Sequence, residues 1–172
     1  FGRALALSPR WAREYSYRSG VHLCQDGDIG EARALLAQAP AAPDLLEADA
    51  LAERLVQLDL LERRYEQAVS RVRALDIEAL SSQWSYVPLS CVVGDALRLK
   101  GDRDGARTQY QHALGQLARQ LEERPDDPRL FSTLGRVHAG LGHREEALRA
   151  AQTGVDLMPI SREDLPRSVP GR

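Results

Sequence analysis

Apolar residues recur along the chain at the spacing of amphipathic helices. Leu134, Val137 and Leu141 fall on one helical face, and Ala147 and Ala151 fall on one face of the next segment. Residues three, four and seven positions apart share one side of a helix and form a stripe that packs against a neighbour. No segment alternates with a period of two, which would be typical of a half-buried strand. The pattern therefore predicts helices and no β-sheet.

Turn and capping residues divide the apolar pattern into eight helices. Gly101 and Gly142 follow apolar stripes, where a left-handed residue ends a helix. Asp28 followed by Glu31 is typical of a capping box, and the two prolines of RPDDPRL (124–130) end one helix and begin another. The predicted helices cover residues 10–25, 28–39, 44–61, 65–78, 83–100, 102–123, 128–140 and 143–157.

The helices repeat in pairs. Four strings share a turn, acidic residues and a closing alanine: GDIGEA (27–32), RRYEQA (63–68), GDRDGA (101–106) and GHREEA (142–147). The closing alanines are 36, 38 and 41 positions apart. Regular spacing of similar units indicates a repeat architecture, in which each helix pair buries its apolar face against the next.

Two glycines lie inside predicted helices and need an explanation. Glycine costs about 1 kcal/mol relative to alanine in a helix interior. We expect Gly94 and Gly135 to lie where the paired helix approaches closely, with Ala106 and Ala147 serving the same purpose on that second helix.

The last two units resemble the tetratricopeptide repeat family. The last unit matches the family's pattern of small and large residues at Leu134, Gly135, His138, Gly142, Ala147, Ala151, Gly154 and Pro159. The unit before it matches at Val93, Gly94, Leu97, Gly101, Ala106, Tyr110 and Ala113. The resemblance is close over 87–161 and looser over 10–80. It implies an all-α fold, a right-handed superhelix of antiparallel helix hairpins.

The resemblance also implies a domain organisation. Residues 1–161 would form one solenoid, and residues 162–172 a tail or a truncated next unit. Within the solenoid, residues 1–9 would be the last helix of a preceding unit, followed by units at 10–42, 43–80, 81–125 and 128–161. The run LGHREEALRAAQTGVDLMPISRED (141–164) is similar to repeat regions of bacterial multidomain regulatory and signalling proteins. That similarity implies that the chain belongs to a larger regulatory protein.

In this family the first helix of each hairpin lines a concave groove that holds a partner segment. The family's groove positions correspond here to Tyr17, Glu53, Gln57, Asp95, Arg98, Arg129, Ser132 and Arg136. Arg98 and Arg136 are the leading candidates, because a guanidinium takes a carboxylate in two hydrogen bonds. The alternative is that they pair with neighbouring acids such as Asp95.

Tyr17 and Trp84 have two equally weighted interpretations. Tyrosine and tryptophan are favoured anchors at binding interfaces, but they also pack between helices. We expect the remaining aromatic residues to pack.

Net charge and the lengths of the apolar runs argue against some classes of function. The 172 residues carry a net charge of −2, which argues against a nucleic acid partner. No run approaches the ~18 apolar residues of a membrane span, and we expect a cytoplasmic protein. The partner expected is a protein or peptide segment. Exposed apolar end faces of an unfinished solenoid would also favour a homodimer.

The sequence offers little reactive chemistry. Cys24 and Cys91 stand alone in apolar stretches, so we expect both to pack, and we expect neither metal nor cofactor. DGDIGE (26–31) and GDRDGA (101–106) lack the third acid of a calcium loop and are interpreted as capped turns. His138 and His143 are five positions apart, a poor spacing for metal ligands on one helix.

The prediction is therefore a non-catalytic protein-interaction scaffold. The alternatives are a ligand-sensing or regulatory domain of a bacterial signalling protein and, less favoured, an RNA-binding helical repeat, which would need a basic groove.

Overall fold

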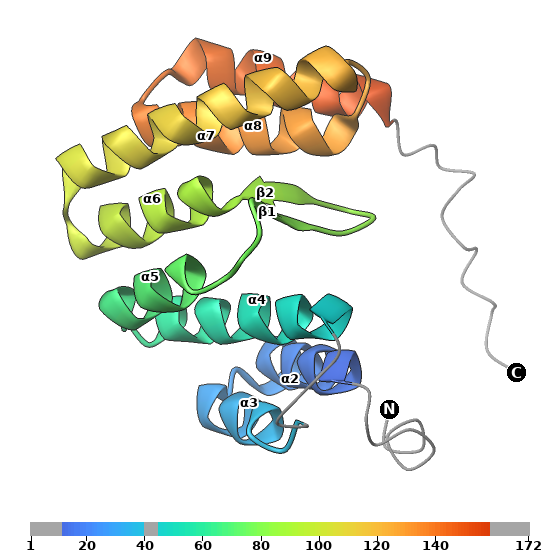
Figure 1. Cartoon of the computed structure of the whole chain (residues 1–172), viewed down its shortest axis with the longest axis vertical. Helices are drawn as coiled ribbons and strands as arrows, with labels where there is room; N and C mark the ends of the chain where they lie inside the picture. Colours follow the sequence, from blue (N-terminus) through green and yellow to red (C-terminus); the bar gives the residue numbers. More distant parts are fainter. Residues whose placement is uncertain (1–11, 40–44, 159–172) are drawn as a thin grey trace, which may run out of the picture.

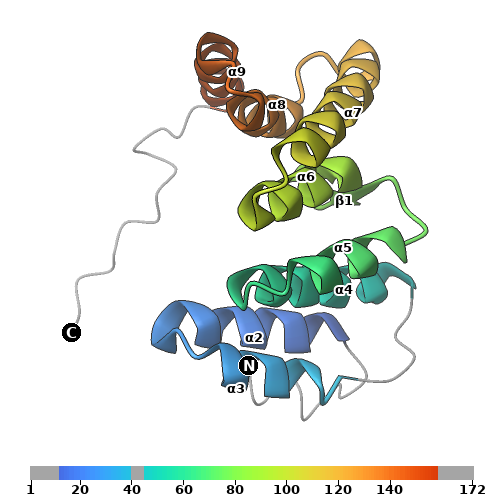
Figure 2. The same cartoon turned by 90° about the vertical axis from the view of Figure 1, so that its left-hand side faces the viewer.

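The structure, a computed structural model, describes residues 12–39 and 45–158. The predicted helix at 1–9, the closing Pro159 and the tail 162–172 lie outside these residues. Eight helices occur in the described part, in four pairs: α2 (Ala12–Asp26) with α3 (Ile29–Leu36), α4 (Leu45–Leu61) with α5 (Tyr65–Arg73), α6 (Leu89–Lys100) with α7 (Arg103–Glu123), and α8 (Pro128–Leu141) with α9 (Arg144–Leu157). The pairs follow one another in chain order along the long axis of the molecule (Figures 1 and 2). The chain is thus mostly helical, as predicted.

Short capped turns reverse the chain within pairs. Gly101 and Gly142 adopt the left-handed conformation, with φ of 97° and 80°, at the ends of α6 and α8. The side chain of Asp28 accepts a hydrogen bond from the N–H of Glu31 at 2.9 Å, and Asp102 caps α7 in the same way. The interpretation of both calcium-like strings as capped turns is confirmed.

The expectation of no sheet was wrong. Strands β1 (Ala79–Ser81) and β2 (Tyr86–Pro88) form an antiparallel hairpin in which Leu80 pairs with Val87. Consequently residues 83–88, predicted as the start of a helix, belong to the hairpin, and α6 begins at Leu89.

Two local preferences favour the hairpin over a helix. Pro88 disfavours helical conformation in the residue before it. The Ser82 hydroxyl accepts hydrogen bonds from the N–H groups of Trp84 and Ser85, both at 3.1 Å, and so competes with helical bonding. Strands of three residues are too short to show a period of two, which explains why the pattern missed them.

Tyr110 of α7 packs between glycines on two other helices. A Cβ atom on Gly94 of α6 would lie 2.9 Å from the Tyr110 ring, and one on Gly140 of α8 would lie 2.5 Å from it. A Cβ on Gly135 would lie 3.2 Å from the carbonyl oxygen of Ala147 in α9. The expected close approach of the paired helix backbone is therefore confirmed at Gly135. At Gly94 the paired helix contributes the Tyr110 ring instead of its backbone, and Gly140 accommodates the same ring.

A buried carboxylate joins three helices in the first half of the chain. Asp59 of α4 is fully buried. It accepts hydrogen bonds from Arg33 of α3 at 2.7 Å and from Arg71 of α5 at 3.0 Å. Glu62 also pairs with Arg33, at 2.5 Å. Burial opposes the charge on Arg33, but the hydrogen bonds that it donates to Glu62 and Asp59 raise its pKa. This cluster ties the first two pairs together.

The outer face of α9 has no neighbouring helix among the described residues. Leu148 and Val155 of α9 are each 61% exposed. An apolar end face is therefore present, and self-association through such a face stays a prediction. None of the described helices is both long enough and apolar enough to cross a membrane.

The two cysteines differ, which corrects the expectation that both pack. Cys91 is fully buried, but Cys24 is exposed on α2. Burial raises the pKa of Cys91 to about 12, so its thiol stays protonated and unreactive at neutral pH.

We expect a thiol reagent to label Cys24 alone in the native protein. Cys91 should react only after unfolding in denaturant. With an aromatic disulfide as the reagent, each reacting cysteine releases one coloured thiolate, whose absorbance gives the number of reactive cysteines. Cys24→Ser should remove the absorbance change seen with the native protein. Rapid labelling of two thiols without denaturant would contradict the packing of α6.

Candidate functional site

A pocket opens between α2, α4 and the β-hairpin. It encloses about 530 Å³. Among its lining residues are three positions that the sequence predicted for a groove, Tyr17 on α2 and Glu53 and Gln57 on α4. The residues at the end of β1 and in the hairpin loop complete it. This aromatic pocket, named here for Tyr17 and Trp84, is the site in which the predicted groove positions of the first two units meet.

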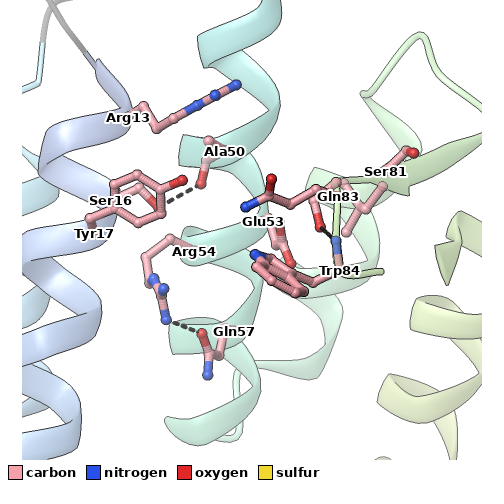
Figure 3. A pocket seen from close by; sticks show the side chains of 12 residues that line it. Arg13, Ser16, Tyr17, Ala50, Glu53, Arg54, Gln57, Ser81, Gln83 and Trp84 are labelled. Atoms are coloured by element: carbon pink, nitrogen blue, oxygen red, sulfur yellow. Dashed lines mark hydrogen bonds between the residues drawn. The ribbon is translucent and has the colours of Figure 1, made fainter. Parts of the chain in front are cut away.

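Tyr17 and Trp84 lie on opposite sides of the aromatic pocket (Figure 3). Tyr17 is 52% exposed and Trp84 is 73% exposed. Of the two interpretations of these residues, interior packing does not fit such exposure. Both rings are left available to a ligand.

Hydrogen bonds hold the loop that carries Trp84. Within the loop, the N–H of Ser82 donates to the carbonyl of Ser85 at 2.8 Å. Arg129 of α8 donates to the carbonyl of Ser82 at 2.7 Å, and Thr133 donates to the carbonyl of Tyr86 at 2.7 Å. The indole is thus displayed by a loop whose backbone is fixed from both sides.

Arg129 therefore has a different role from the predicted one. Its guanidinium also pairs with Asp127 at 2.6 Å, and hydrogen bonds from Arg129 hold the pKa of Asp127 below its usual range. With these contacts made, Arg129 supports the loop from outside the aromatic pocket. The sequence analysis did not identify Thr133 as a residue that holds the loop. The feature that could have indicated it is its place as a small polar residue on the apolar face of α8.

On the α4 side of the aromatic pocket, some polar groups are already hydrogen-bonded and one is not. Arg54 donates to Gln57, and its guanidinium covers Gly20 of α2. Ser16 of α2 donates to the carbonyl of Ala50 at 2.9 Å, which joins the two helices. The Glu53 carboxylate is exposed and makes no hydrogen bond or ion pair with any residue that the structure describes. Glu53 is therefore open to a cationic group.

Three of the remaining predicted groove residues, Asp95, Arg98 and Arg136, meet in a second pocket, of about 500 Å³, between α4, α6 and α8. Its polar centre is Asp95, which is buried. Asp95 accepts a hydrogen bond from the hydroxyl of Tyr110 at 2.6 Å and forms an ion pair with Arg136. Arg98 donates to the Tyr110 hydroxyl at 3.3 Å. Burial and the bond to Asp95 raise the pKa of Tyr110, so the hydroxyl remains a donor.

This arrangement matches the alternative in which the arginines pair within the chain. Arg136 already holds the carboxylate of Asp95 and lies over a buried network. Arg98 is exposed, and the one side-chain hydrogen bond that it makes within the described part of the chain is the 3.3 Å bond to Tyr110. Ser132 is exposed on α8 and lines neither pocket. Of the two pockets, the aromatic pocket offers more unpaired groups.

The two histidines come closer than their spacing indicated. The Nδ1 atoms of His138 and His143 lie 3.4 Å apart, because Gly142 turns α9 back along α8. Burial and the neighbouring His143 lower the pKa of His138. Within residues 12–39 and 45–158, no cluster of three or more metal-ligating side chains occurs.

Comparison with known proteins gives no matching family model and no matching curated protein.

Proposed function

We propose that the chain is a non-catalytic scaffold that binds a segment of another protein on the side formed by its first helices. The observation that carries this proposal is the aromatic pocket. Two large aromatic side chains face it from different elements, and both remain exposed. Exposed tryptophan and tyrosine beside a cavity are typical of the anchors that dominate protein interfaces.

We also propose that the helix pairs wind into a right-handed superhelix of tetratricopeptide type. Pairs joined by capped turns support this, as do the close contacts at Gly94 and Gly135, two positions at which the sequence resembles the family. Both pockets involve first helices of pairs: α2 and α4 in one, and α4, α6 and α8 in the other.

The mechanism would be preorganisation. Hydrogen bonds hold the loop backbone around Trp84, and Ser16 joins α2 to α4, so the aromatic pocket exists before a partner arrives. Because the site is already ordered, less conformational entropy is lost when a partner binds, and the complex is more stable. The parent protein would be a larger regulatory protein, as the sequence similarity implies, and the chain would supply its docking surface.

We expect the double variant Tyr17→Ala/Trp84→Ala to lose partner binding without losing stability. Truncation of an interface anchor weakens binding by about tenfold or more, and both side chains are too exposed to support the fold. Partners captured from lysate by the wild type, after nuclease treatment, would be identified and their affinities compared between variants.

Leu148→Ala is the matched control, because it removes an exposed apolar side chain on α9, far along the chain from the aromatic pocket. It should retain partner affinity. Equal capture by the double variant and the wild type would refute the assignment of the site, and capture lost on nuclease treatment would favour an RNA-binding repeat.

A further inference from the structure

The hairpin has one open edge. In an antiparallel pair, residues alternate between those that exchange hydrogen bonds with the partner strand and those whose N–H and C=O groups point away. The bonds from Ser82 N–H to Ser85 and from Leu89 N–H to Glu78 flank the pairing of Leu80 with Val87 and fix this alternation. The backbone groups of Ala79 and Ser81 therefore point away from β2.

The other edge is closed. Pro88 has no N–H, and the carbonyl of Tyr86 accepts a hydrogen bond from Thr133. Strand β2 contacts α6, α7 and α8, whereas Leu80 and Ser81 of β1 line the aromatic pocket. An exposed strand edge is a template for an additional strand. Here that template borders a cavity that has exposed aromatic side chains at its sides.

The charges of the aromatic pocket indicate what a strand should carry. Glu53 is the acidic group of the pocket, and it makes no ion pair among the described residues. Arg54 is turned toward Gly20 and Gln57. In Figure 3, Glu53 lies toward Trp84, and Arg13 lies at the far end, beyond Ala50. A basic side chain is therefore complementary to the hairpin end of the aromatic pocket.

We propose that the partner binds as a third strand: an extended segment pairs with Ala79 and Ser81 and places a basic side chain against Glu53. This inference rests on the proposed scaffold function. Main-chain bonds would supply affinity that tolerates changes in sequence, while Glu53, Tyr17 and Trp84 would supply selectivity. Proline or N-methylated residues at the pairing positions would be excluded, because they lack the donor that the open edge requires.

The test uses a capped heptapeptide, Thr-Val-Thr-Lys-Thr-Val-Thr, added at millimolar concentration to the ¹⁵N-labelled protein. We expect chemical-shift changes at the amides of Ala79 and Ser81 and slower hydrogen exchange at both. The same peptide with every amide N-methylated should leave the spectrum unchanged.

A charge exchange tests the role of Glu53. Glu53→Lys should weaken binding of the lysine peptide by about fivefold, as expected for an exposed ion pair replaced by a repulsion. Replacing the central lysine of the peptide by glutamate should restore binding to this variant. Glu145→Lys is the control: it reverses an exposed acidic residue on α9, outside the aromatic pocket, and should leave the preference for lysine intact.

Three results would overturn strand addition. The first is the absence of protection at Ala79 and Ser81 with millimolar peptide. The second is equal binding of the N-methylated peptide. The third is concentration-dependent protection without any peptide, which would identify the occupant as a second copy of the chain. If capture still depends on Tyr17 and Trp84 in these cases, the scaffold function stands and only strand addition is wrong.

Discussion

Asp59→Ala should lower the free energy of unfolding by about 3 kcal/mol. The carboxylate is fully buried and neutralises Arg33 and Arg71, which come from the helices on either side of α4. Removing it leaves two guanidinium groups close together without their shared partner. Breaking a buried pair on one side costs about 3–5 kcal/mol, and partial exposure of both arginines reduces this toward the lower end. Urea unfolding followed by circular dichroism measures the change.

The control is an ion pair on the surface. Glu66 and Lys100 lie 2.8 Å apart, but both side chains are exposed. Glu66→Ala should leave the urea midpoint unchanged within error, because water and salt screen exposed pairs. A similar loss in both variants would mean that Asp59 acts by its charge alone and that its burial is irrelevant.

Gly140→Ala should destabilise the protein by about 1–2 kcal/mol, although alanine is the better helix former. The new Cβ would lie 2.5 Å from Cε2 and Cζ of Tyr110. The ring cannot easily retreat, because Gly94 contacts its other edge and its hydroxyl is bonded to Asp95. The steric cost therefore exceeds the gain of about 1 kcal/mol in helix propensity.

Gly115 is the matched control, an exposed glycine on the helix that carries Tyr110. It lies in α7, and a Cβ there would meet nothing within 4 Å. Gly115→Ala should therefore stabilise the protein by about 0.5–1 kcal/mol. In addition, Tyr110→Leu should reduce the cost of Gly140→Ala, since it removes the ring atoms that clash. Stabilisation by both alanines would contradict the packing of Tyr110.

Features that depend on a few neighbouring residues were predictable from the sequence. The helix turns at Gly101 and Gly142 follow from the conformational freedom of glycine at a left-handed position. The close contacts at Gly94 and Gly135 follow from the cost that an unneeded glycine would carry inside a helix. Both rest on local physical chemistry, and both are confirmed in the structure.

Features that depend on distant neighbours were missed. Arg129 was assigned to the groove, but its orientation is set by Asp127 and by a carbonyl 47 positions away. Arg136 was a candidate for binding a partner's carboxylate, but the acceptor is Asp95, 41 positions away. In the aromatic pocket, Tyr17, Glu53 and Gln57 were anticipated by counting groove positions. The contribution of the β-hairpin was not, because its loop is placed by α8.

The two hydrogen bonds from α8 to the hairpin also bear on the order in which the chain folds. Most helix contacts join elements adjacent in sequence, and such local contacts form quickly. The bonds from Arg129 to Ser82 and from Thr133 to Tyr86 each close a loop of 47 positions, which must wait until α6 and α7 have paired and turned the chain back. The surface around Trp84 should accordingly be among the last parts of the molecule to reach its native structure. During synthesis this surface would become able to bind a partner only after α8 has emerged from the ribosome.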